Sequence, residues 1–114
     1  MTEMTIEKIP NLYFGNVIKA IRLANNMSKY RFKIVLGISS PYLYHIETGK
    51  YIPSREKVIK IAKNANVNKD ALLVIAGYLP ENIALIMKEG VTVYKAYCRN
   101  LYTEIRNIQE KYKV

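Results

Sequence analysis

The sequence predicts an all-α protein in which five short helices form one domain and a C-terminal helical extension follows. Two observations predict this fold. Apolar residues recur at spacings of three or four along most of the chain, which places them on one side of a helix. Ser, Asn, Gly and Pro stand between these segments, where helices begin and end. We therefore divide the chain into an N-terminal arm at 1–11, a five-helix domain at 12–80 and the extension at 81–114.

The first two helices are separated by a pair of Asn residues. The first is expected from about Leu12 to Asn25, and Asn25-Asn26 ends it because Asn accepts the left-handed backbone conformation more readily than other non-glycine residues. Ser28 then caps the second helix. The side chains expected to face the core are Phe14, Val17, Ile18 and Ile21 from the first helix and Phe32, Val35 and Leu36 from the second.

The third helix lies in a segment with clear start and stop signals, which reads GISSPYLYHIETGKYIPS from Gly37 to Ser54. Gly37 can turn the chain with a positive φ, and Ser39 can cap a helix from about Ser40 to Thr48. A proline suits the first turn of this helix, and Gly49 ends it. Leu43 and Ile46 face the core, which leaves Ser40, Tyr44, His45 and Thr48 pointing outward.

Two further helices complete the domain. Ser54 starts the fourth, which stops near Asn64 to Asn66, and Asn68 caps the fifth, which Gly77 closes. Their expected inward side chains are Val58, Ile61 and Ala62 in the fourth helix and Leu72, Leu73, Ile75 and Ala76 in the fifth.

The extension contains a short helix and then a long one. Glu81 to Lys88 form the short helix, Gly90 breaks it, and Thr92 caps a helix that runs to about Lys113. The long helix carries an apolar and aromatic stripe: Val93, Tyr94, Tyr97, Leu101, Ile105, Ile108 and Tyr112. Exposed, such a stripe promotes aggregation, whereas burial against a second copy gives a symmetric dimer. We expect dimerisation through Tyr94, Tyr97, Leu101, Ile105, Ile108 and Tyr112; the alternative is that the helix folds back onto the first and fifth helices.

Positive charge is concentrated in the middle of the chain. The whole sequence carries a net charge of +9. Between Lys19 and Lys63, ten Lys or Arg residues meet two acidic residues, so this segment alone carries +8, whereas from Lys69 onward seven bases meet five acids. A local excess of positive charge is typical of a surface that contacts phosphate.

The sequence shows few features of disulfide-bonded, metal-binding, enzymatic or membrane proteins. Cys98 has no partner for a disulfide, and no Cys/His cluster has the spacing of metal ligands, so we expect neither a metal nor another cofactor. No Ser, Cys or carboxylate at helical spacing completes a catalytic set around His45, the one obvious general base. The sequence shows no signal peptide and no apolar run long enough to cross a membrane, which favours the cytoplasm.

The third-helix segment carries a pattern found in one family. Its residues are Gly37, Ile38, Ser39, Tyr42, Leu43, Ile46-Glu47, Gly49-Lys50 and Pro53-Ser54, and the pattern extends to Ile18, Ile21, Arg22, Ser28, Phe32, Ala71-Leu72-Leu73 and Ala76-Gly77-Tyr78-Leu79-Pro80. Over roughly residues 14–80 the chain resembles the XRE-type helix-turn-helix regulators, the group that includes Cro and phage repressors. The resemblance implies a lambda-repressor-like domain of five helices whose third helix enters the major groove of DNA.

The resemblance also implies roles for individual side chains. Phosphate contacts would be made by Lys29, Ser39, Tyr42, Lys50, Tyr51 and Ser54. Bases would be read by Ser40, Pro41, Tyr44 and His45. Arg22 and Glu47 match a structural ion pair that ties the first helix to the third.

The reading residues are unusual for this family. Tyr44 stands where Ser is common, so its ring suggests contact with a thymine methyl or packing on a sugar, while His45 and Ser40 can hydrogen-bond to base edges. The set lacks the Arg, Gln or Asn side chains that form bidentate pairs, which favours modest direct readout with DNA shape adding specificity. Lys33 replaces the Ala that the family places where the second and third helices touch.

Together these features predict a sequence-specific regulator of transcription that binds double-stranded DNA: a prokaryotic or phage repressor that binds a palindromic operator as a homodimer and has no enzymatic activity. Two alternatives stay open. One is the antitoxin of a toxin–antitoxin pair that represses its own promoter, with the toxin as a protein partner. The other is an adaptor or anti-repressor that kept the fold and uses its ten tyrosines to bind protein instead of DNA.

Overall fold

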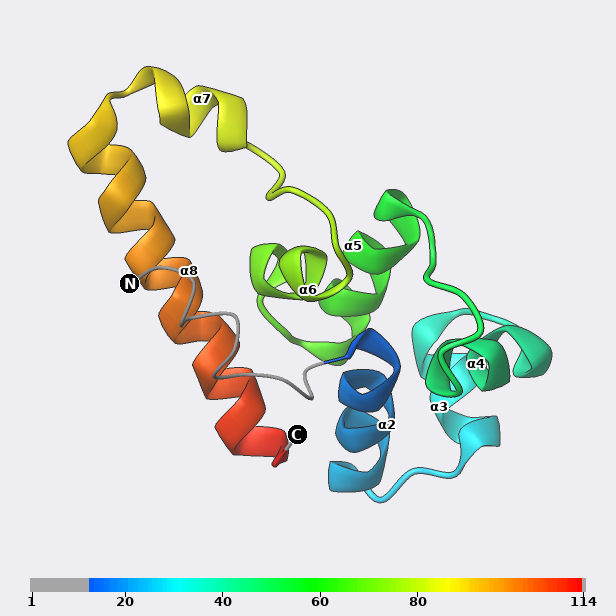
Figure 1. The fold of residues 1–114 in the computed structure, drawn as a ribbon. Coiled ribbons are helices and arrows are strands. Elements are labelled where there is room, and N and C mark those ends of the chain that lie inside the picture. The colour runs from blue at the N-terminus through cyan, green and yellow to red at the C-terminus, as the bar shows by residue number, and fades with distance from the viewer. Residues whose placement is uncertain (1–12, 114) are drawn as a thin grey trace.

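The computed structural model of the protein describes residues 13–113, and every regular element in this range is a helix (Figure 1). The helices are α2 (Phe14–Ala24), α3 (Lys29–Leu36), α4 (Ser40–Glu47), α5 (Arg55–Ala65), α6 (Lys69–Ile75), α7 (Ile83–Lys88) and α8 (Val91–Tyr112). The predicted all-α fold is therefore confirmed. The expected arm at 1–11 and the expected helix start at Leu12 lie outside the described residues.

Local hydrogen bonds define where α3 to α6 begin. Ser28, Ser39, Ser54 and Asn68 each accept a hydrogen bond from the backbone N–H three residues later, at donor–acceptor distances of 3.2, 3.2, 3.3 and 2.8 Å. These bonds satisfy amides that have no acceptor within the helix. The caps predicted at Ser28, Ser39 and Asn68 and the helix start predicted at Ser54 are therefore confirmed.

The turn between α3 and α4 depends on a residue with a left-handed backbone. Gly37 ends α3 with a φ of 73°, a conformation that glycine adopts without steric cost. The chain therefore changes direction sharply, and α4 packs against both α3 and α2. This turn places the predicted reading helix.

The core lies between α2, α3, α4, α5 and α6. Its buried side chains from these helices are Phe14, Val17, Ile18, Ile21, Phe32, Leu36, Leu43, Ile46, Val58, Ile61, Ala62, Ala71, Leu72 and Leu73, with Ala76 directly after α6. The prediction was wrong for Val35, which is 39% exposed. Phe32 and Leu36 lie one turn apart and take the inner face of α3, and Val35 is rotated by about 100° from Leu36 towards solvent.

The C-terminal half of α8 closes this core. Ile105 and Ile108 are buried, and Leu101 and Tyr112 are partly buried against the same cluster, because α8 packs along α2 and α6 (Figure 1). The helix therefore folds back onto its own domain, the alternative considered above. These four side chains are correspondingly not free for the dimer interface to which the sequence analysis assigned them, since a periodic stripe does not reveal which surface covers it.

A hydrogen bond anchors the middle of α8. The Tyr97 hydroxyl donates to a carboxylate oxygen of Asp70 on α6, at 2.6 Å. Burial and this bond raise the pKa of Tyr97 well above its ordinary value, so the hydroxyl stays protonated and continues to donate. The same carboxylate accepts a hydrogen bond from the backbone N–H of Glu81, which lies in the connection between α6 and α7.

The two ends of the extension differ from its middle. Helix α8 begins at Val91, directly after Gly90, whose φ is 114°. Thr92 therefore lies inside the first turn, and the prediction that it caps the helix was wrong. Helix α7 has no buried residue and packs mainly against α8 (Figure 1). Together α7 and the start of α8, residues 83–94, form a helical hairpin that projects from the domain, here called the α7–α8 hairpin.

Candidate nucleic-acid interface

Helices α3 and α4 lie side by side at the end of the molecule opposite α8 (Figure 1). Leu43 and Ile46 fix α4 in the core, and the Ser39 cap and Pro41 start it. Ser40, Pro41 and Tyr44 are exposed on the other side of the helix. One face of α4 is thus buried for packing, and its first turn is left open to solvent.

A buried ion pair holds the C-terminal end of α4. The Arg22 Nε atom on α2 donates to Glu47 Oε2 at 2.8 Å, and Nη2 donates to Oε1 at 3.1 Å, so the two planar groups meet through two parallel bonds. The third nitrogen of Arg22 donates to the carbonyl oxygen of Met27 at 3.2 Å. The pair therefore connects α2, α4 and the turn before α3, as the family resemblance implied.

Gly15 is a positioning residue that the sequence analysis missed. It lies in the first turn of α2, where a Cβ would overlap the carbonyl oxygen of Ile46 and approach that of Glu47 to 3.1 Å. Only a residue without a side chain allows α2 and the end of α4 to come this close. The available signal was a glycine inside a predicted helix, which costs stability unless a close approach requires it.

The predicted base-reading residues differ in their exposure to solvent. Ser40 and Pro41 are exposed and the Tyr44 side chain is 52% exposed, whereas His45 is half-buried. The His45 Nδ1 atom is buried without a hydrogen-bond partner among residues 13–113. The expectation that His45 points fully outward was therefore wrong. The centre of the Tyr51 ring, from the loop after α4, lies 5.4 Å from the centre of the imidazole.

The predicted phosphate-contacting residues surround the open face of α4. Lys29, Lys50, Tyr51, Ser39 and Ser54 are exposed, and Tyr42 is half-buried. The two serine oxygens accept the capping bonds described above, which leaves each hydroxyl proton free to donate to a phosphate.

The charge and the protonation state of the side chains on this face favour the binding of an anion. Burial, followed by the nearby Tyr51 and Tyr78 hydroxyls, raises the pKa of Tyr42, so it also remains a donor. Of the two acidic residues between Lys19 and Lys63, Glu47 is paired with Arg22, which leaves Glu56 as the exposed one. The basic segment therefore presents a surface with little opposing charge.

Helices α3 and α4 remain in contact with Lys33 at this position. The residue is partly buried, and its ammonium lies 4.9 Å from the centre of the Tyr30 ring on the same helix. The aliphatic part of the side chain covers apolar surface while the charge stays near solvent.

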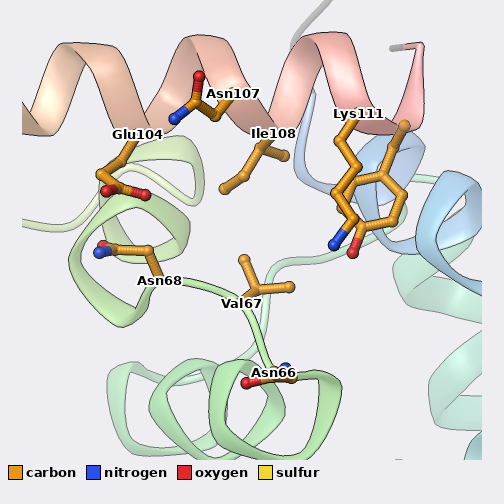
Figure 2. Close-up of a pocket in the computed structure, with 8 residues that line it drawn as sticks. Asn66, Val67, Asn68, Glu104, Asn107, Ile108 and Lys111 are labelled. Carbon is orange, nitrogen blue, oxygen red and sulfur yellow. The ribbon is translucent and has the colours of Figure 1, made fainter.

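A separate hollow of about 140 Å³ lies between the α5–α6 turn and α8 (Figure 2). It is lined by Asn66, Val67, Asn68, Glu104, Asn107, Ile108, Lys111 and Tyr112. Val67 and Ile108 point toward each other across it, and the remaining lining is largely polar (Figure 2). None of its residues belongs to α3 or α4, so this hollow is a feature of how α8 packs and not part of the open face.

Residues 13–113 contain no group of three or more His, Cys, Asp or Glu side chains arranged to hold a metal ion. None of the helices described here combines the length and the hydropathy needed to cross a membrane. Cys98 is a half-buried free thiol on α8.

Comparison with known families identifies the domain. Residues 18–72 match the family model described as Helix-turn-helix. No match to a curated protein or to a solved structure was found. The matched range runs from α2 into α6 and contains the α3–α4 unit, the Arg22–Glu47 pair and the open face of α4. The matched residues therefore form a helix-turn-helix domain of the XRE type, which supports a role as a DNA-binding transcriptional regulator.

Proposed function

We propose that the protein is a repressor that recognises a specific sequence in double-stranded DNA by placing α4 in the major groove. The observation that carries this proposal is the combination of a fixed helix with an open first turn. The Arg22–Glu47 pair and the close approach at Gly15 hold α4 to α2, and Ser40, Pro41 and Tyr44 are free to meet base edges. A regulator of this kind acts by occupying DNA, without catalysis, in the cytoplasm.

Contacts to the phosphate backbone would come from both sides of α4. The N–H groups of Lys29 and Tyr30 stand at the start of α3, where a helix has unpaired donors and a positive end. Lys50, Tyr51 and Ser54 follow the C-terminal end of α4. They supply positive charge and hydroxyl donors. These contacts would position the protein, and α4 would read the sequence.

We further propose that the protein binds a palindromic operator as a homodimer. One short helix contacts few base pairs, whereas two reading helices about 34 Å apart read both halves of a palindrome. The sequence analysis placed the interface on the stripe of α8, much of which is used inside the monomer. The α7–α8 hairpin, with the linker before it, carries exposed apolar side chains that support a different interface: Leu79, Leu85, Met87, Val91 and Val93.

The same exposed side chains support a second candidate function. A toxin or another protein partner could cover the hairpin, in which case the chain is an antitoxin or an adaptor. Light scattering at high protein concentration separates the two proposals, because a chain that stays monomeric contradicts the homodimer.

DNA retention tests the proposed function directly. The purified protein is mixed with fragments of its own genome, and the retained fragments are compared with random duplex of equal length in gel shifts at moderate salt. We expect a preferred fragment and an affinity that falls with salt, with a log–log slope of about −0.9 for each phosphate contacted. An equal affinity for retained and random duplex would contradict sequence-specific repression.

A further inference from the structure

Four aromatic rings form a continuous row across the open face of α4. The ring centres of Tyr42 and Tyr51 are 5.5 Å apart, those of Tyr51 and His45 are 5.4 Å apart, and those of His45 and Tyr44 are 5.7 Å apart. Tyr42, Tyr44 and His45 come from α4, and Tyr51 comes from the loop after it. We call these four residues the aromatic row.

A lysine lies over each end of the aromatic row. The Lys57 ammonium is 5.8 Å from the centre of the Tyr42 ring, and the Lys29 ammonium is 5.2 Å from that of the Tyr44 ring. Such cation–π contacts stabilise the position of an aromatic ring, more so where solvent is excluded. Tyr44 is therefore held between His45 and Lys29, although 52% of it remains exposed.

The open face of α4 offers few groups that can hydrogen-bond to bases. Its exposed side contributes the Ser40 hydroxyl and the Tyr44 hydroxyl, while Pro41 contributes an apolar ring. His45 is half-buried, with its Nδ1 atom covered. The Thr48 hydroxyl donates to the Tyr44 carbonyl oxygen at 2.9 Å and is occupied within the helix. The surface that Tyr44 presents is therefore mainly apolar.

Among the four bases, thymine alone presents a methyl group in the major groove. The apolar part of an aromatic ring on the reading helix is matched by that methyl group, whereas the Tyr44 hydroxyl alone could bond to a polar base edge. We infer that Tyr44 recognises thymine through its 5-methyl group, so that each DNA half-site carries a thymine opposite Tyr44, one turn beyond the start of α4. The inference rests on the proposed DNA-binding function and adds the base to which the site responds.

Uracil substitution tests this inference, because uracil differs from thymine only by the missing methyl group. Duplexes bound by the full-length protein are first selected from a random-sequence library, and each common thymine is then replaced singly by uracil. For the thymine under Tyr44 we expect a Kd about fourfold higher, equivalent to about 0.8 kcal/mol for one buried carbon. Other replacements should change the Kd by less.

Three variants assign the effect to the Tyr44 ring. Tyr44→Ala should raise the Kd for the thymine duplex and remove the further loss on uracil substitution, because the methyl then has no partner. Tyr44→Phe keeps the ring and should keep the response to uracil. Tyr102→Ala is the control, since Tyr102 lies on α8 with Arg106 over its ring and should leave binding and the uracil response unchanged.

The outcomes separate this inference from the function on which it rests. If no duplex is enriched, both are overturned. If a sequence is enriched but lacks a common thymine, or if uracil binds as tightly as thymine, specific binding stands and thymine recognition is overturned. A loss with Tyr44→Phe as large as with Tyr44→Ala shows that the hydroxyl makes the contact, and this too overturns recognition of the methyl. Circular dichroism confirms that each variant is folded.

Discussion

The side chains of Arg22 and Glu47 hold α4 against α2. Both are buried, and each satisfies the charge of the other through two hydrogen bonds. A buried charge that loses its partner still carries its full desolvation penalty. Removing one partner therefore lowers the free energy of unfolding by more than the intact pair adds to it.

We predict that Glu47→Ala lowers the free energy of unfolding by about 3–5 kcal/mol, because Arg22 is left as an uncompensated buried charge. Glu56→Ala is the matched control. Glu56 lies exposed in the first turn of α5, where a carboxylate contributes at most about 1 kcal/mol. Urea unfolding followed by circular dichroism measures both. Similar losses for the two variants would show that the Arg22–Glu47 pair is not a buried structural contact.

Gly15 gives a second prediction at the scale of one residue. Gly→Ala inside a helix ordinarily adds up to about 1 kcal/mol of stability. Here we expect Gly15→Ala to lower both the melting temperature and the affinity for DNA, because the new methyl group overlaps the Ile46 carbonyl oxygen and displaces α4. Asn16→Ala, an exposed neighbour on α2, should have little effect on either. A stabilised Gly15→Ala protein would mean that α2 and α4 are not in close contact.

Helices α3 to α6 were predictable in detail because their limits are set locally. A serine or asparagine cap bonds to an amide three residues away, and a left-handed turn needs Gly or Asn, so both signals are visible within a few residues of sequence. Features that depend on distant packing were not predictable to the same degree. The close approach of Gly15 to the Ile46 carbonyl oxygen involves two segments whose separation in space the sequence does not state.

The packing of helix α8 was likewise not predictable from the sequence alone. Its stripe was visible in the sequence, but a period of three to four residues fits the surface of the same domain as well as that of a second copy. The partners of the stripe proved to be α2 and α6 of the same chain.

The placement of α8 leads to a prediction about stability. We expect Ile105→Ala to lower the free energy of unfolding by about 2–5 kcal/mol, the usual cost of truncating a buried aliphatic side chain. Val93→Ala, on the exposed part of the same helix, should cost less than about 1 kcal/mol. Chemical unfolding at low protein concentration makes the comparison. If the Ile105→Ala protein were as stable as the Val93→Ala protein, α8 would not be packed on the core.

Two exposed surfaces lie at different ends of the part of the chain that the structure describes. The open face of α4 with the basic segment lies at one end, and α8 with the α7–α8 hairpin lies toward the other (Figure 1). In the proposed complex, this arrangement would leave the hairpin free for a second subunit while α4 is on DNA.

We predict that Leu85→Asp produces a folded monomer with weakened operator binding, because a charge in an apolar interface opposes association of the hairpins. Leu23→Asp is the control, since Leu23 is similarly exposed but lies on α2. Light scattering measures mass, and circular dichroism measures folding. A full-length wild-type protein that is monomeric at high concentration would exclude this dimer.

In the proposed complex α4 reads the base sequence while flanking lysines hold phosphate, and one set of affinities tests this division of roles. The Kd for the preferred duplex and for random duplex is measured for the wild type, Tyr44→Ala and Lys50→Ala. We expect Lys50→Ala to weaken both complexes about equally and to reduce the salt slope by about one phosphate. Tyr44→Ala should mainly weaken the preferred complex, by about 1 kcal/mol or more, and so lower the ratio of the two affinities. An unchanged ratio in Tyr44→Ala would contradict a reading role for α4.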